Sequence, residues 1–195
     1  MEVKLLIDGQ DVSASNIAVF DRIDPVTGEV ASTAAAATKE DVNKVVEAAS
    51  RAFANWSKTG PGERRDILLK AADIMASKAD EFTKFMLEET GATPGWSGFN
   101  VMLASGMLRE AASMTTQING EVIPSNKPGT LAMAVRKPVG VCVGIAPWNA
   151  PVILGVRAIA IAIACGNTVI LKSSELCPGT HRLIGQVLVE AGLPN

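Results

Sequence analysis

The chain has 195 residues, of which 48% are hydrophobic and 19% are charged, and its formal net charge at pH 7 is −2. This composition excludes a disordered or low-complexity protein and is typical of one well-buried domain or of part of a larger one. The sequence has no Lys/Arg-rich block, which argues against a nucleic-acid partner and against a polybasic membrane patch.

Cysteine and histidine usage indicates a reducing compartment. The sequence contains one histidine, His181, and three cysteines, Cys142, Cys165 and Cys177. Because no CxxC pair occurs, we expect that the chain has no metal site, that its thiols are free and that the protein is cytoplasmic. The segment MEVKLLIDGQDV carries acidic residues and no long apolar run, so no signal peptide is expected.

The first elements along the chain are short strands. VKLLIDGQDV predicts a hairpin whose turn is Asp8-Gly9, and DPVTGEV at 24–30 predicts a further turn. Thr38 then opens TKED, and the pair Thr38 and Asp41 approximates a capping box at the start of a helix.

Four helices are expected before residue 119. The first continues to Trp56 at helical spacing, and Pro61 is placed to begin the second. The third is expected over 79–90, ending at Gly91, and the fourth over roughly 97–118.

The remaining sequence alternates between strands and helices. LAMAVRKPVG and GVCVGIAP predict strands, the second of them buried, and NTVILK predicts another buried strand. PVILGVRAIAIAIAC has isoleucines in alternation, which favours a strand, but Val152, Val156, Ile159 and Ile163 share a helical face, so we predict a helix. Arg157 and Gly166 interrupt this apolar stretch, so a membrane span is not expected. A last helix should end at Gly192, and the order from 139 onward indicates an α/β protein with a parallel sheet.

The segment GIAPWNAP at 144–151 contains the first candidate site residue, Asn149. Taken alone, Asn149 is best explained as a helix N-cap, and the alternative is a hydrogen-bond donor at the carboxyl edge of a sheet. Lys172 and Glu175 follow the next strand and are either a solvated pair or a clamp for ribose hydroxyls. The fingerprint GxGxxG is absent, so a dinucleotide site would need another arrangement.

Several motifs together resemble the aldehyde dehydrogenase superfamily. They are PVGVCVGIAPWNAPV, ACGNTVILKSSE and EAGLP, with DPVTGEV, ERRDILLKAADIMASKADEF, EETGA and GEVIP upstream in the same order. The resemblance runs from about residue 4 to 195 and is greatest to salicylaldehyde and related aromatic aldehyde dehydrogenases. It implies oxidation of an aldehyde to a carboxylate with NAD⁺, or alternatively NADP⁺, through a cysteine thiohemiacetal in the full-length enzyme.

The resemblance assigns roles to individual positions. It makes the Asn149 side chain the donor to the reacting oxyanion and gives the ribose to Lys172 and Glu175. It also implies that the cofactor groove is lined by Ile145, Ala146, Pro147 and Trp148. Because the carboxylate of Glu175 would repel a 2′-phosphate, NAD⁺ is preferred over NADP⁺.

The same resemblance implies a substrate tunnel. Arg157, eight residues after Asn149, is placed there to bond a ring hydroxyl or a carboxylate, unless it is a solvated charge. The other wall residues would be Ala150, Ile153 and Leu154, with Leu103 and Trp96 from the preceding helix.

The family's nucleophilic cysteine and general-base glutamate correspond to positions outside this chain. Cys142 and Cys165 are expected in a strand and at a helix C-terminus, and Cys177 precedes a helix N-terminus, which could mildly acidify it. The chain is thus interpreted as an N-terminal part of the enzyme that is inactive alone. The expected segments are an N-terminal β-arm or hairpin over 1–30, the helical part of the cofactor domain over 38–118, a β-segment of the oligomerisation arm over 119–138, and the first βαβα of the NAD-binding domain over 139–195.

Alternatives to this interpretation remain open. The chain could be a non-catalytic nucleotide-binding or oligomerisation module, or part of a semialdehyde dehydrogenase in which Arg157 holds the substrate carboxylate. The expected partners are a small aldehyde and further copies of the chain, as a homodimer or homotetramer when full length, with VKLLIDGQDV and LAMAVRKP both contributing to the arm.

Overall fold

The structure, a computed structural model, describes residues 1–194. Five short strands precede the first helix: β1 (Glu2–Val3), β2 (Leu5–Ile7), β3 (Gln10–Val12), β4 (Val19–Ile23) and β5 (Val30–Ala35). β2 and β3 form the predicted hairpin, in which Asp8 and Gly9 both adopt positive φ, as a tight two-residue turn requires. β1, β5 and β4 form a separate three-stranded sheet, and the sequence patterns had not predicted β4 and β5.

Four helices follow, as expected: α1 (Lys39–Trp56), α2 (Pro61–Ser77), α3 (Ala79–Thr90) and α4 (Pro94–Met114). The capping box of α1 is confirmed, because Thr38 and Asp41 exchange hydrogen bonds between side chain and backbone. Gly91 ends α3 in the left-handed conformation. The predicted bounds of α4 were wrong: Thr93 caps the helix and Pro94 occupies its first turn, so it begins three residues earlier than expected.

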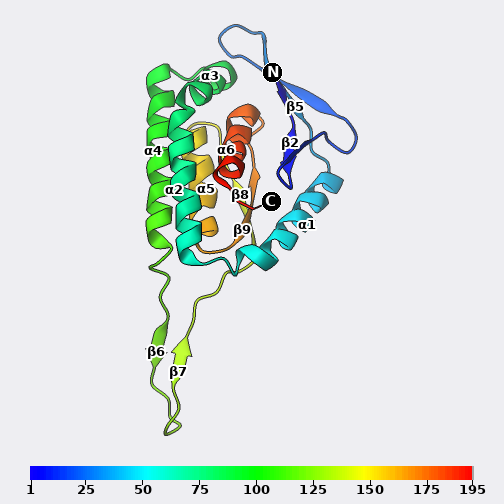
Figure 1. The fold of residues 1–195 in the computed structure, drawn as a ribbon. Coiled ribbons are helices and arrows are strands. Elements are labelled where there is room, and N and C mark those ends of the chain that lie inside the picture. Colours follow the sequence, from blue (N-terminus) through cyan, green and yellow to red (C-terminus); the bar gives the residue numbers. More distant parts are fainter. Residues whose placement is uncertain (195) are drawn as a thin grey trace.

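After α4 the chain leaves the body of the molecule as a hairpin of β6 (Glu121–Ile123) and β7 (Ala132–Ala134), visible at the bottom of Figure 1. This hairpin and β2–β3 belong to different sheets. β2 contacts α1 and α6 instead, so VKLLIDGQDV and LAMAVRKP do not pair with each other in this chain, and their contribution to an oligomerisation arm stays a prediction.

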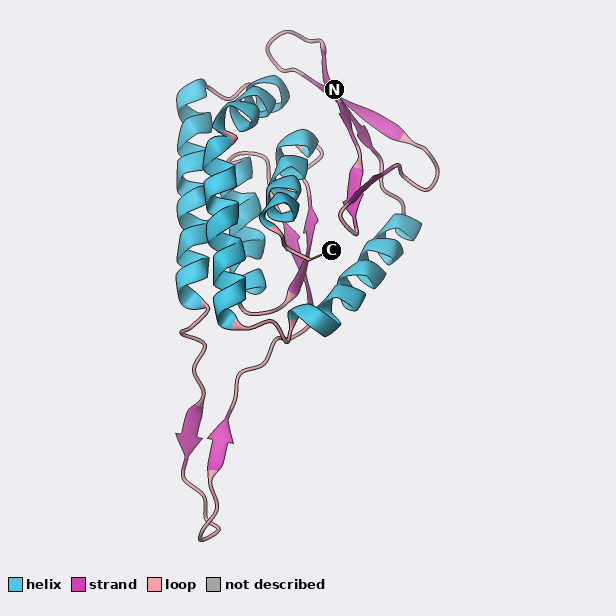
Figure 2. Cartoon of the chain, in the orientation of Figure 1, coloured by secondary structure: helices cyan, strands magenta, loops and turns pink. Residues whose placement is uncertain are grey.

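The last part of the chain has the predicted βαβα order: β8 (Val141–Ile145), α5 (Pro151–Ala164), β9 (Thr168–Lys172) and α6 (Pro178–Ala191). β8 and β9 pair in parallel from Val141 opposite Thr168 to Ile145 opposite Lys172, which confirms the α/β class. α5 contacts both strands on one face of this sheet and α1 contacts both on the other (Figure 2). A Cβ on Gly144 would lie 2.9 Å from Ala158, so glycine is what allows β8 and α5 to approach.

The core lies where α2, α3, α4, α5 and α6 pack together (Figure 1), and its fully buried side chains include Leu68, Phe82, Leu108 and Ile163. The expectation that β8 is buried was only half right. Val143 and Ile145 are 61% and 73% exposed, because the second face of this two-stranded sheet is incompletely covered. Within residues 1–194 none of the helices has the length and apolar character needed to cross a membrane.

Candidate functional site

The carboxyl ends of β8 and β9 lie side by side and bring the predicted site residues to one edge of the sheet. Ile145 is opposite Lys172, and the next amide, that of Ala146, donates to the Lys172 carbonyl at 3.2 Å. Two turns continue from this edge, the 146–150 turn leading into α5 and the 173–177 turn leading into α6. Ligands of parallel α/β sheets bind at such an edge, so both turns are placed to contact one ligand.

Asn149 lies in the 146–150 turn with its side chain exposed. The interpretation of Asn149 as the N-cap of α5 is wrong: the N-cap is Ala150, which makes no side-chain capping bond, and Pro151 is the first helical residue. The backbone carbonyl of Asn149 accepts a hydrogen bond from Trp96 Nε1 at 3.3 Å. Among the described residues no hydrogen bond engages the carboxamide, so it is available to a ligand at the sheet edge.

The residues predicted to hold a cofactor flank the same edge. Ile145, Pro147 and Trp148 are exposed, whereas Ala146 is buried. Lys172 Nζ and Glu175 Oε2 lie 3.7 Å apart, and both side chains are more than half exposed. Backbone hydrogen bonding at Glu175 and the nearby Lys172 charge lower the pKa of the Glu175 carboxyl, which keeps it ionised. An ammonium and a carboxylate are therefore presented together.

A groove of about 640 Å³ runs between α1, β9 and α6 and reaches this pair. Lys172, Ser173 and Glu175 line it, with apolar walls that include Val46 and Val143. Asn149 does not line the groove, so the structure presents the predicted ribose residues and the predicted oxyanion donor on two adjoining surfaces rather than in one pocket.

The predicted substrate residues occupy both α4 and α5. Arg157 is exposed on α5, and because Asn149 precedes that helix, their eight-residue spacing does not place them on one helical face. Ala150 and Ile153 are buried. Leu154 and Leu103 are partly exposed.

An exposed aromatic pair lies on α4, and only one of its members, Trp96, is a predicted site residue. Trp96 and Phe99 stack with ring centroids 5.6 Å apart, and both rings are more than 40% exposed. Their i, i+3 spacing in WSGF was the available signal for this pairing. Because Trp96 also bonds the Asn149 carbonyl, the aromatic surface directly adjoins the 146–150 turn.

The cysteines differ in their surroundings. Cys142 and Cys165 are partly exposed, while Cys177 is fully buried and is itself the N-cap of α6. The expectation that Cys177 is mildly acidified is wrong, because burial and the nearby Glu89 raise the pKa of its thiol to about 12. Residues 1–194 contain no group of three or more His, Cys, Asp or Glu side chains placed to hold a metal ion.

Glu89, in the EETGA motif, is a fully buried carboxylate that sequence reasoning missed. It accepts bonds from the Gly179 and Thr180 amides at 2.7 and 2.9 Å and from the Ser32 hydroxyl at 2.9 Å. Burial raises the pKa of its carboxyl, and the bonds to Thr180 and Gly179 oppose that rise. Glu89 thereby caps α6 from another helix and fixes where the 173–177 turn ends.

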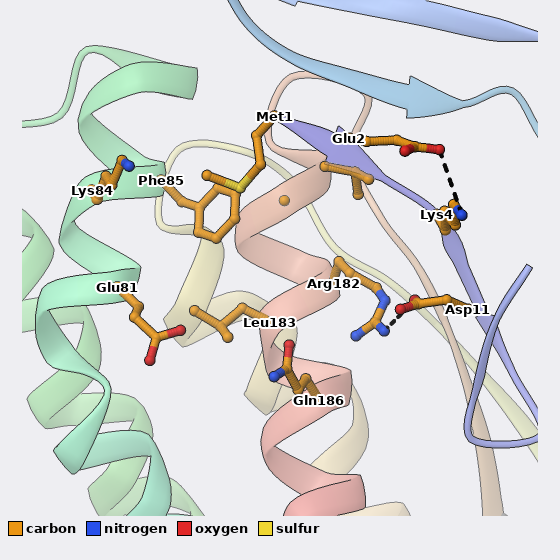
Figure 3. A pocket seen from close by; sticks show the side chains of 12 residues that line it. Met1, Glu2, Lys4, Asp11, Glu81, Lys84, Phe85, Arg182, Leu183 and Gln186 are labelled. Atoms are coloured by element: carbon orange, nitrogen blue, oxygen red, sulfur yellow. Dashed lines mark hydrogen bonds and ion pairs between the residues drawn. The ribbon is translucent and has the colours of Figure 1, made fainter.

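A second hollow, of about 550 Å³, lies between the N-terminal strands, α3 and α6. Its wall includes Lys4, Asp11, Phe85 and Arg182, as Figure 3 shows. None of the predicted site residues lines it, so it is separate from the edge of β8 and β9.

Comparison with known proteins agrees with this geometry. Residues 12–195 match the family model described as the aldehyde dehydrogenase family. The chain is 62% identical over 191 residues to a vanillin dehydrogenase from Pseudomonas sp. strain HR199, covering 98% of this chain and 40% of the relative. It is similar to the crystal structure of a salicylaldehyde dehydrogenase from Pseudomonas putida G7 complexed with salicylaldehyde, with a TM-score of 0.97, 47% identity and coverage of 100% and 40%.

A further solved structure, of PnpE in complex with nicotinamide adenine dinucleotide, is 35% identical with a TM-score of 0.96, covering all of this chain and 40% of that one. The chain thus spans about two fifths of the length of the proteins that it matches.

Proposed function

The chain belongs to the aldehyde dehydrogenase family, and we propose that it supplies the cofactor-binding and oxyanion-binding part of an enzyme that oxidises an aromatic aldehyde to the carboxylate with NAD⁺. The observation that carries this proposal is the exposed Asn149 carboxamide, held on a turn between two prolines at the carboxyl edge of the parallel strands.

The proposed role of Asn149 is to donate a side-chain N–H to the carbonyl oxygen of the aldehyde as it gains negative charge. Pro147 restricts the start of the 146–150 turn, Pro151 restricts its end and Trp96 holds the Asn149 backbone carbonyl, so the backbone that carries the amide is fixed before the substrate arrives. A preorganised donor of this kind contributes about 3 kcal/mol to transition-state stabilisation, or roughly a hundredfold in rate.

The residues at the sheet edge suit a nicotinamide adenine dinucleotide. Lys172 and Glu175 present a donor and an acceptor that match the vicinal hydroxyls of a ribose. The exposed Ile145 and Trp148 offer apolar surface for a flat ring. The chemistry that the bound cofactor would supply is acceptance of a hydride, while the residues of this chain hold and orient it.

An aromatic substrate is favoured by two features. Vanillin and salicylaldehyde, named in the relatives, are both hydroxylated benzaldehydes. The exposed Trp96–Phe99 pair adjoins the 146–150 turn and offers a surface on which an aromatic ring can stack. We assign Arg157 to the substrate side of α5, where its guanidinium would bond the ring hydroxyl.

The attacking thiolate is assigned to a residue outside these 195 positions. Cys177 is buried with a raised pKa, Cys142 lies within β8, and Cys165 is the C-cap of α5, at the opposite end of that helix from the 146–150 turn. The isolated segment should therefore be inactive. The β6–β7 hairpin, with Val122, Leu131 and Met133 exposed, is the proposed contact with a second copy in a homodimer or homotetramer.

The proposal is tested in a complete polypeptide that contains this chain, with vanillin, salicylaldehyde, benzaldehyde and succinate semialdehyde as substrates. Asn149→Ala should lower kcat by about 10²- to 10³-fold, because it removes the oxyanion donor. The affinity for NAD⁺ and the thermal midpoint should change little, since the side chain is exposed and caps nothing. A variant that retains full kcat would refute the role of Asn149.

A second experiment tests the substrate assignment through Arg157→Leu. The preference for hydroxylated benzaldehydes over benzaldehyde should decline by about tenfold in kcat/KM, the size expected for one bond to a charged donor. Ile161→Leu is the matched control, because Ile161 is also exposed on α5 but carries no charge. An unchanged preference in the Arg157→Leu enzyme would remove Arg157 from the site.

A further inference from the structure

His181, the only histidine of the chain, connects the two turns of the sheet edge. Its ring lies in the first turn of α6 and is 2% exposed. The Ser174 amide donates to Nδ1 at 3.1 Å, and Nε2 lies 3.1 Å from the Pro151 carbonyl oxygen. Since an amide can only donate and a carbonyl can only accept, Nδ1 is unprotonated and the ring proton is on Nε2.

Ser174 lies within the 173–177 turn, and Pro151 is the first residue of α5, directly after the 146–150 turn. Pro151 follows Asn149 by two residues, and Ser174 immediately precedes Glu175. The β8–β9 ladder ends at Ile145 and Lys172, and past the Ala146 amide no hydrogen bond among the described residues joins the two turns directly. The ring of His181 is the next tie between them.

The surrounding fold is shaped to admit the ring. A Cβ on Gly155, in α5, would lie 3.3 Å from His181 Cδ2 and 2.5 Å from Ile184 Cδ1. The absence of a side chain at Gly155 therefore lets α5 approach the ring closely. Burial lowers the pKa of the imidazole to about 4, so the neutral form that makes both hydrogen bonds persists at neutral pH.

A thiol–imidazole pair is a competing explanation that the geometry disfavours. Cys177 Sγ lies 3.8 Å from Nδ1 and 3.9 Å from Nε2 of His181. Both ring nitrogens are already engaged by backbone groups, and the buried thiol has a pKa of about 12. The pair consequently lacks both a free base and an available thiolate.

We infer that His181 is a positioning residue that holds the 146–150 turn and the 173–177 turn at a fixed separation. Asn149, the proposed oxyanion donor, and the Lys172–Glu175 pair, the proposed ribose site, can then act on one bound cofactor–substrate pair. This inference rests on the proposed function. The two hydrogen bonds of the His181 ring form a bridge, and each bond has its own consequence. The bond to Pro151 orients the 146–150 turn, which is used in the chemical step, and the bond from Ser174 orients the 173–177 turn, which is used in cofactor binding.

Two substitutions of His181 each remove one of its two hydrogen bonds and keep the other. His181→Asn retains an acceptor near the position of Nδ1 for the Ser174 amide but does not reach the Pro151 carbonyl. His181→Gln retains a donor near the position of Nε2 for Pro151 but leaves the Ser174 amide without its acceptor. His181→Leu removes both bonds and keeps the position filled.

In the complete polypeptide, kcat at saturating cofactor and the calorimetric Kd for NAD⁺ are measured for each variant. His181→Asn should lower kcat about tenfold with the Kd within about twofold of wild type, and His181→Gln should raise the Kd about tenfold with kcat within about twofold. His181→Leu should show both changes. Ile184→Val is the matched control, since it loosens the same contact with Gly155 without touching either turn and should lower only the thermal midpoint.

Two results would overturn the inference. Variants that lower the thermal midpoint while their folded enzyme keeps wild-type kcat and Kd would reduce His181 to a core residue. If kcat decreased equally and Kd increased equally in His181→Asn and His181→Gln, His181 would likewise be reduced to a core residue. If wild type oxidises no aldehyde, the proposed function fails, and the bridge is then judged on the NAD⁺ Kd alone: it stands if His181→Gln weakens binding and His181→Asn does not, and it falls otherwise.

Discussion

Trp96 and Asn149 are joined by a hydrogen bond from the indole Nε1 to the backbone carbonyl, 3.3 Å long and spanning 53 positions of sequence. The bond ties the first turn of α4 to the 146–150 turn at a point between Pro147 and Pro151. The prolines restrict the backbone torsions of the turn, while Trp96 fixes its position relative to the rest of the fold.

Replacing Trp96 by Phe should lower kcat of the complete enzyme about fivefold, because the Asn149 carbonyl loses its donor while the aromatic ring and its stacking remain. The Kd for NAD⁺ should stay within about twofold of wild type, since Lys172 and Glu175 are untouched. Phe99→Leu is the control that keeps the indole hydrogen bond, and it should affect KM for an aromatic aldehyde instead. Equal kcat in Trp96→Phe and wild type would show that the 146–150 turn keeps its conformation without the Trp96 hydrogen bond.

The sequence predicted those parts of the fold whose determinants are local. Thr38 with Asp41, and the helix-ending Gly91 and Gly192, lie within a few residues of the backbone that they stabilise, and the structure confirms each of them. The parallel pairing of β8 and β9 also followed, because a strand–helix–strand order permits little else.

The site was harder to predict, because its supports are non-local. Glu89 meets Gly179 across 90 positions, and no pattern near either residue indicates this contact. His181 was noted only as the single histidine, and its role depends on two turns meeting at the end of a sheet. Asn149 is not the N-cap of α5, because Pro151 at the first helical position places the N-cap at Ala150.

Glu89→Gln should destabilise the complete enzyme by about 3 kcal/mol, measured by chemical denaturation. The carboxylate oxygens accept from the Gly179 and Thr180 amides, and an amide group in their place leaves one of these buried donors facing another donor. Glu88→Gln, at the neighbouring and only partly buried position, should change the free energy of unfolding by less than about 0.5 kcal/mol. Matching losses in the two variants would contradict the capping role of Glu89.

Glu175→Gln should shift cofactor preference toward NADP⁺ by about tenfold in the ratio of kcat/KM values. The substitution removes a negative charge that would repel a 2′-phosphate, while Lys172, 3.7 Å away, remains to attract it. Glu190→Gln, which removes the same charge from the far end of α6, should leave the ratio unchanged. If the ratio does not move in Glu175→Gln, the ribose is not bound at this pair.

The stability of the fold should depend on pH through His181. The pKa of its imidazole is lowered by burial, and further by the charge of Lys172, from 6.5 to about 4. Between these values the unfolded chain takes up a proton that the folded chain excludes, so the contribution is complete above pH 6.5 and is lost as the pH falls toward 4. The loss amounts to about 3 kcal/mol, at about 1.4 kcal/mol for each pKa unit.

His181→Gln provides the comparison, because its amide does not titrate and the carboxylates that also titrate in this interval are retained. The free energy of unfolding, obtained by urea denaturation at pH 4.5, 5.5, 6.5 and 7.5, should decline more steeply in wild type than in the variant, by about 1 kcal/mol or more per pH unit at the acid end. The variant is expected to be the less stable protein at pH 7.5 and to approach wild type near pH 4.5. Parallel curves for the two proteins would mean that the folded chain protonates His181 as readily as the unfolded chain does, and the buried, neutral, doubly bonded ring would be contradicted.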